Sequence, residues 1–187
     1  MNDILNSLYN HFIVSEQAKV MLDKIIFQKD YKKGTVILKE GEICNHLYFI
    51  KKGFARGFIS QNGKDITSWF AFENDVATPF YSFVTRKPGF ENIEILEDST
   101  LYAISYENIQ QLYRQFPEFN LIGRIVTEKY YIELMTRTIS FQFQSAKERY
   151  LQLLTNQPQL LHRASLGLIA SYLGISQETL SRIRTKI

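Results

Sequence analysis

The final segment of the chain carries polar and charged side chains whose types and spacing suit contact with a nucleic acid. Six of them fall at the start of one predicted helix: Ser176, Gln177, Glu178, Thr179, Ser181 and Arg182. In a major groove, arginine can bond guanine, glutamate can accept from cytosine N4, and glutamine can pair with adenine. Serine and threonine hydroxyls at a helix start suit phosphate oxygens. The segment is therefore predicted to contact double-stranded DNA.

The residues around this segment have the spacing of two helices clamped at a fixed angle. Five apolar residues form the clamp: Ile169, Leu173, Ile175, Leu180 and Ile183. Ala170 is small enough to let the second helix pass closely over the first, and Gly174 can take the left-handed conformation that ends the first helix. Ser176 can cap the second helix, and Glu178 suits its dipole. This is the helix-turn-helix pattern, whose second helix turns its outward face to the major groove.

A helical hairpin that docks onto a protein partner is the alternative interpretation of the same pattern. The charge distribution favours DNA. Residues 145–187 carry six Lys/Arg and two Glu, a net charge of +4, whereas residues 1–144 carry 16 Lys/Arg and 17 Asp/Glu. The positive charge of the chain therefore belongs to its C-terminal quarter, where a polyanionic partner is expected.

Bulk composition indicates an ordinary globular protein. Of the 187 residues, 45% are apolar and 22% are charged, and no apolar run approaches the ~20 residues that span a bilayer. The N-terminus lacks a signal-like segment, and the single cysteine, Cys44, fits a reducing compartment. We therefore expect a cytoplasmic protein with no membrane partner. The scattered histidines His11, His46 and His162 do not have metal-ligand spacing, so no metal site is predicted.

The elements that must position the C-terminal helices fall into three groups. Residues 1–30 have helical spacing and predict one or two short helices. Short β-rich runs then alternate with glycine turns and predict strands at residues 35–38, 47–50, 55–59, 66–72, 93–96 and 101–104. Asn62-Gly63 between two of these runs predicts a hairpin. Strands at this interval are typical of an antiparallel sandwich or barrel. Beyond Ser105 the pattern is helical, with a short helix that ends at Phe116-Pro117.

A long helix is predicted from about Phe119 to Phe143, and it carries two apolar faces. One is a coiled-coil-like stripe with alternating steps of four and three, interrupted at Glu128. We call this stripe the seam, and it consists of Leu121, Ile125, Ile132, Met135 and Ile139. We expect the seam to join two copies of the chain, because Ile122, Val126 and Tyr130 form a second face that could pack on the chain's own core. A core helix that lies on its own domain is the alternative.

The whole arrangement resembles the cAMP receptor protein/FNR family of bacterial transcription regulators. Residues 33–37, 40–42, 47–50 and 52–53 are similar to the opening strands of that family's double-stranded β-helix, and residues 102–105 resemble the exit from it. Residues 174–182 are close to the family's recognition motif, in which Gln177, Glu178 and Arg182 occupy the base-reading positions. Gln177 stands where the family usually has arginine, which implies a different operator.

The resemblance implies an α+β fold with three parts. These are a cyclic-nucleotide-binding-like β-roll with flanking helices (residues 1–117), a dimerisation helix (118–144) and a helix-turn-helix domain (145–187). It also implies a homodimer that binds a palindromic DNA site, with RNA polymerase as a further candidate partner. The sequence does not identify the operator, or whether the protein activates or represses.

Two departures from the family limit this transfer. Residues 76–91 lack the Gly-Glu pair and the later arginine that hold a cyclic phosphate, and carboxylates at Glu91, Glu94 and Glu97 stand near the arginine position. The effector is therefore expected to differ from cAMP, and no cofactor is predicted. A candidate pocket for a small molecule consists of Phe80, Tyr81, Phe83 and Arg86, with filling of the barrel core as the alternative role of the aromatic residues. The chain also stops at the recognition helix, which predicts fewer phosphate contacts and a shallower salt dependence.

Three classes of function can be compared on this basis. The first is a homodimeric regulator that binds DNA, and the second is a small-molecule-sensing module whose helical hairpin binds a protein. The third, an enzyme, is disfavoured, because only His46 lies in the barrel region and one cysteine cannot hold an iron–sulfur cluster. No nucleophile paired with a base is evident either.

Overall fold

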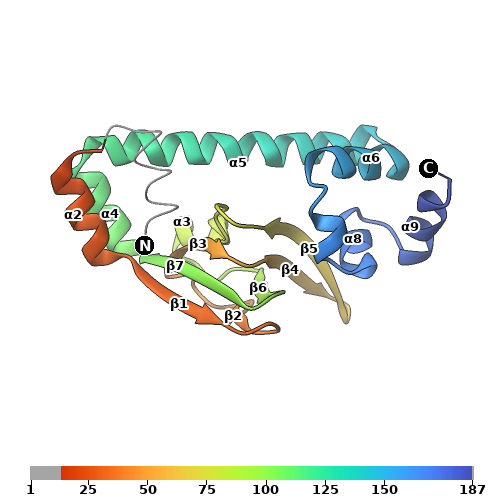
Figure 1. The fold of residues 1–187 in the computed structure, drawn as a ribbon, viewed down its shortest axis with the longest axis horizontal. Coiled ribbons are helices and arrows are strands. Elements are labelled where there is room, and N and C mark those ends of the chain that lie inside the picture. The colour runs from red at the N-terminus through yellow and green to blue at the C-terminus, as the bar shows by residue number, and fades with distance from the viewer. Residues whose placement is uncertain (1–13, 187) are drawn as a thin grey trace.

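The computed structural model describes residues 14–186, and two antiparallel sheets form its centre (Figure 1). One sheet has the order β1-β7-β3 and the other the order β2-β6-β4-β5. The strands are β1 (Phe27–Tyr31), β2 (Val36–Leu38), β3 (His46–Lys52), β4 (Ala55–Gln61), β5 (Lys64–Ala71), β6 (Asn92–Ile95) and β7 (Ser99–Ser105). This is the predicted double-stranded β-helix, here called the β-roll. The hairpin between β4 and β5 turns at Asn62 and Gly63, both with positive φ, as the sequence predicts.

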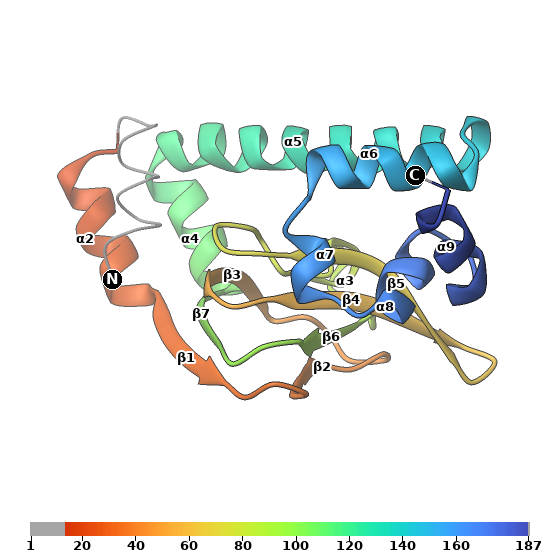
Figure 2. The same cartoon turned by 45° about the vertical axis from the view of Figure 1, so that its right-hand side comes forward.

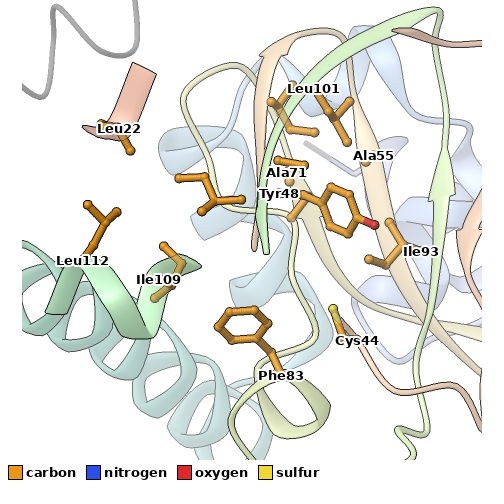
Figure 3. Packing of buried hydrophobic residues seen from close by; sticks show 14 of the residues in the cluster. Leu22, Cys44, Tyr48, Ala55, Ala71, Phe83, Ile93, Leu101, Ile109 and Leu112 are labelled. Atoms are coloured by element: carbon orange, nitrogen blue, oxygen red, sulfur yellow. The ribbon is translucent and has the colours of Figure 1, made fainter. Parts of the chain in front are cut away.

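The core of the β-roll lies between the two sheets. On β3, Tyr48 and Ile50 face inward and are 8% and 0% exposed, opposite Ala103 and Leu101 of β7. Side chains from the second sheet, among them Ala55 and Ile93, meet them across the roll (Figure 3). Because side chains alternate along a strand, the intervening residues of β3 and β7 face the opposite side of the sheet, where helices cover them.

Eight helices accompany the strands in the described residues. They are α2 (Glu16–Ile25), α3 (Phe80–Thr85), α4 (Tyr106–Gln115), α5 (Pro117–Phe143), α6 (Ala146–Asn156), α7 (Leu160–Arg163), α8 (Leu166–Tyr172) and α9 (Gln177–Arg184). Helix α5 runs along the whole molecule, with α2 and α4 at one end and α6, α8 and α9 at the other (Figure 1). Serine caps α2, α4, α6, α8 and α9, each through a hydroxyl that accepts a backbone N–H. No helix in this part of the chain is both long enough and apolar enough to cross a bilayer.

Two local predictions differ from the structure, and one helix was not predicted. The segment Phe27–Tyr31 lies in a region predicted to be helical, but it is a strand because it pairs with the edge of β7. Its own polar residues do not indicate a strand. Helix α3 was not among the elements predicted from the sequence. The long helix begins at Pro117 rather than near Phe119, since a proline at the first helical position lacks only an N–H that would have no partner there. The parts of residues 1–30 that precede Val14 lie outside the described residues.

The C-terminal helices share a second apolar core with the β-roll. This core contains Leu153, Leu160, Ile169, Leu173 and Leu180 from the helices, together with Phe54 and Phe72 from the roll. The edge strand β5 meets α8 directly: Thr67 N donates to Ser171 Oγ (2.9 Å), which donates to Asp65 O (3.0 Å). Covering an edge strand in this way removes unpaired backbone groups. The C-terminal helices therefore have a defined position on the β-roll (Figure 2).

Candidate nucleic-acid interface

Helices α8 and α9 take the geometry that their sequence predicts. Leu180 and Ile169 are fully buried, Ala170 and Leu173 nearly so, and Ile175 and Ile183 pack against the same core. Gly174 has φ +68° in the turn, and a side chain there would also collide with the ring of Phe141, since an added Cβ would lie 2.7 Å from its Cε1. Both conformation and space therefore require glycine at this turn.

The predicted recognition face of α9 is exposed. All six of its residues (Ser176, Gln177, Glu178, Thr179, Ser181 and Arg182) are exposed. Ser176 Oγ accepts from Thr179 N (3.2 Å) as the helix cap and lies 3.1 Å from Thr179 Oγ1. The pKa of Glu178 is lowered, first by a hydrogen bond from Ser176, so it is a carboxylate at neutral pH. Arg182 forms no ion pair within residues 14–186, and its guanidinium is available to an external acceptor.

The five residues of the predicted seam are exposed in the single chain. Leu121, Ile125, Ile132, Met135 and Ile139 have exposed fractions of 46, 38, 63, 44 and 50%. The second face of α5 packs internally instead: Ile122 is buried in the main core, Val126 packs against it, and Tyr130 Oη accepts from Val76 N (2.7 Å). The alternative of a core helix on its own domain therefore applies to this second face and not to the seam.

One residue on the seam face was missed by sequence reasoning. Phe143, at the last position of α5, is 79% exposed, the largest fraction among the exposed large apolar side chains. It follows Ile139 by four positions, which is the spacing of neighbours on one helix face, whereas the alternation of steps leads from Ile139 to Gln142 instead.

A second group that the sequence did not reveal ties α7 to the β-roll. Arg163 donates to both carboxylate oxygens of Glu73 (2.7 and 3.0 Å) and of Glu97 (3.0 and 2.8 Å). Its guanidinium also lies over the rings of Phe54 and Phe72, at 5.3 and 5.4 Å. The partners are 90 and 66 residues away in sequence, so no local pattern indicated the pairing.

Acid is expected to weaken this connection. Hydrogen bonds from Arg163 are the largest cause that lowers the pKa of Glu73, from 4.5 to about 2, with Gly53 N as a further donor. Because the folded-state pKa is depressed, the stabilisation is complete above pH 4.5 and is lost as pH falls from there towards 2. Urea unfolding across this interval should show a smaller loss of stability for Glu73→Gln than for the wild type. Equal losses in the two proteins would contradict the assignment.

The four residues of the predicted effector pocket, Phe80, Tyr81, Phe83 and Arg86, have different surroundings. Phe80 and Phe83 border a small apolar cavity of about 100 Å³ between α3, α4, α5 and the outer face of β3 and β7. Tyr81 packs instead against Phe90, with ring centroids 5.2 Å apart. Arg86 donates to Cys44 O (2.7 Å) and stacks over the Tyr106 ring, so it stabilises the fold around α3. A pocket formed by all four residues therefore stays a prediction.

The three carboxylates at the position of the family's phosphate-binding arginine have partners inside the protein. Glu91 accepts from Trp69 and Ser68, Glu94 from Arg56 (2.6 Å), and Glu97 from Arg163. Arg56 is itself only 7% exposed. Glu94 and Glu97 thus form internal ion pairs, and Glu91 is held by two neutral donors. Cys44 is also internal, and burial raises the pKa of its thiol to about 11, which keeps it protonated.

A β-roll, a long helix with an exposed apolar stripe and two short C-terminal helices joined by a tight turn define the fold class of the cAMP receptor protein/FNR regulators. Residues 28–116 match the family model of the cyclic nucleotide-binding domain, so the chain contains a domain of this type. The resemblance predicted from the sequence is confirmed at the level of domain and fold.

Solved structures with this fold cover nearly the whole chain. A CooA variant from Carboxydothermus hydrogenoformans is 19% identical with a TM-score of 0.74, over 99% of this chain and 84% of CooA. A transcriptional regulator assigned to the CRP/FNR family from Eubacterium rectale is 21% identical with a TM-score of 0.74, over 96% and 85%. FixK2 from Bradyrhizobium japonicum is 18% identical with a TM-score of 0.75, over 87% and 84%. A search of curated protein sequences found no match.

Proposed function

We propose that the protein is a homodimeric transcription regulator that binds a two-fold symmetric DNA site through α9. The observation that carries the proposal is the exposed recognition face, held on a pair of helices whose apolar positions are all packed. The net charge of +4 in residues 145–187 supports a polyanionic partner. The fold shared with CooA, FixK2 and the E. rectale regulator supports the same class of function.

Within the recognition face, Gln177, Glu178 and Arg182 would read bases, while Ser176, Thr179 and Ser181 would contact phosphates or the groove walls. Gln177 lies at the flank, where its Oε1 would be 3.3 Å from a Cβ added at Gly167. Pairing two chains along the seam would place two copies of α9 about one helical turn of DNA apart, ~34 Å. A palindromic operator follows from this symmetry. The three parts, residues 1–117, 118–144 and 145–187, then act as effector domain, dimerisation helix and DNA-binding domain.

Selection of bound fragments from a random duplex pool tests the proposal. The expected product is a palindromic consensus bound with a steep dependence on salt. If the helical hairpin instead docks onto a protein, no consensus should emerge and no duplex should bind at physiological salt. Repeating the selection with cell metabolites shows whether an effector changes the affinity.

Arg182→Ala tests base reading at a single position. We expect a loss of about 1–3 kcal/mol on the selected operator and a relaxed preference at one base pair, because an arginine–guanine contact is removed. Fluorescence anisotropy with a set of operators substituted at single positions measures both effects. The control is Arg114→Ala, in the last turn of α4 and far from α9 in sequence and fold. An equal loss on every sequence would instead identify Arg182 as a phosphate contact.

A further inference from the structure

A cavity of about 410 Å³ lies where the C-terminal half of α5 meets α6 and the end of α8. Figure 1 shows α6 beside this half of α5, with α8 below them. The volume falls in the range of ~300–1,000 Å³ that is typical of small-molecule sites. The walls combine cationic, aromatic and amide side chains, and they include Arg137, Arg149, Phe141, Tyr172, Asn156 and Gln157.

No ion pair within residues 14–186 neutralises the positive charge of this cavity, although the Glu91 carboxylate attracts Arg137 from beyond ion-pair distance. Neither Arg137 nor Arg149 forms an ion pair with a carboxylate in residues 14–186. Glu133 is the single acidic side chain among the lining residues, and its ion-pair partner is Lys129 (3.9 Å). A guanidinium removed from water without a counter-charge is unfavourable. The cavity is therefore suited to an anion from outside the chain.

The two arginines are held differently. Arg149 donates through Nε and Nη2 to Leu173 O (3.3 and 3.0 Å) and through Nη1 to Gln144 O (2.7 Å), so all three of its nitrogens are occupied. Arg137 donates through Nη2 to Tyr172 O (3.3 Å), while its buried Nε has no hydrogen-bond partner among the described residues. Gln157 Oε1, also on the cavity wall, is buried and unpartnered in the same way. Nη1 of Arg137 also forms no hydrogen bond within residues 14–186, and unlike Nε it is not fully buried, so it is the donor that a ligand can reach.

The cavity lies on a different face of α5 from the seam. At 3.6 residues per turn, Glu133, Arg137 and Ser140 are centred about 120° around the helix from the seam residues. The cavity face continues the internal face of Ile122, Val126 and Tyr130 towards the end of α5. Only Ile132 belongs to both the seam and the cavity lining. Pairing of two chains along the seam would therefore border the cavity without filling it.

We propose that this cavity binds a small organic anion, a carboxylate on a flat apolar body, with Arg137 as its counter-charge. Guanidinium and carboxylate groups form charge-assisted hydrogen bonds, for which Nη1 of Arg137 is free, since it has no partner within residues 14–186 and is not fully buried. The rings of Phe141 and Tyr172, whose centroids lie 5.1 and 4.6 Å from the Arg137 guanidinium carbon, provide apolar walls beside it. Arg137 also donates to Tyr172 O at the end of α8. A ligand bound to Arg137 would therefore affect the position of the helices that carry the recognition face. That consequence rests on the proposed function, whereas binding itself does not.

Calorimetric titration of the full chain with benzoate, in the absence of DNA and at low salt, tests the site. We expect saturable binding at one site per chain, and binding of the neutral isostere benzamide that is at least about tenfold weaker. Arg137→Gln should weaken benzoate binding by a similar factor. Arg124→Gln, which removes an exposed guanidinium from the same helix, should leave it unchanged.

Asn156→Asp provides a second variant in case Arg137→Gln does not fold, because Asn156 is an exposed residue of the cavity wall. It adds a negative charge at the rim and should weaken benzoate but not benzamide. Absence of benzoate binding, equal binding of benzoate and benzamide, or benzoate binding that neither variant changes would overturn the proposal. Since none of these measurements involves DNA, their failure is distinguishable from failure of the regulator proposal.

Discussion

Ile132→Glu is expected to convert the protein to a monomer and to weaken its binding to a symmetric operator by at least ~100-fold. Ile132 is 63% exposed in the single chain and sits at the centre of the seam. In a symmetric dimer each interface would bury two added carboxylates without partners, at a cost of several kcal/mol. About 1.4 kcal/mol corresponds to a factor of ten in affinity, so a hundredfold effect needs only a fraction of this cost.

Sedimentation analysis measures the oligomeric state and anisotropy measures the affinity for DNA. Leu134→Glu is a matched control on the same helix, since Leu134 is 60% exposed but lies roughly opposite the seam at 3.6 residues per turn. It should leave the dimer intact. A dimeric Ile132→Glu protein, or equal dissociation by both variants, would show that the seam is not the interface.

Leu180→Ala is expected to lower the free energy of unfolding by about 2–5 kcal/mol, the range for a leucine removed from a packed core. Leu180 is the fully buried residue of α9 in the second apolar core, and Ile183 of the same helix packs against this core. The loss should also reduce DNA binding, because the same contact orients the recognition face. Urea unfolding of the purified variant gives the magnitude.

Leu151→Ala on α6 provides the comparison, since Leu151 is 38% exposed and a surface substitution typically changes stability by no more than about 0.5 kcal/mol. If Leu180→Ala were as stable as Leu151→Ala, α9 would not be anchored by this core. Retained DNA affinity in a destabilised Leu180→Ala protein would show instead that the recognition face is positioned by other contacts.

The sequence by itself determined the features that depend on local periodicity. The α8–α9 pair could be predicted because Gly174, Ser176 and Leu180 each satisfy a steric or hydrogen-bonding requirement set by residues close in sequence. The two faces of α5 were separable for the same reason: steps of three and four mark a stripe wherever the helix lies. The hairpin at Asn62-Gly63 also follows from two adjacent residues. In these cases the interaction partners are neighbours along the chain.

Only the tertiary structure decided which distant groups meet. Strand β1 forms because it pairs with the edge of β7. The polar residues of β1 alone do not predict a strand. The attachment of the C-terminal helices to the β-roll depends on Ser171 at the edge of β5 and on Arg163 between two carboxylates. The cavity at Arg137 likewise requires three helices to converge. Such contacts join residues tens of positions apart, and a local pattern cannot specify a partner that only the folded chain brings near.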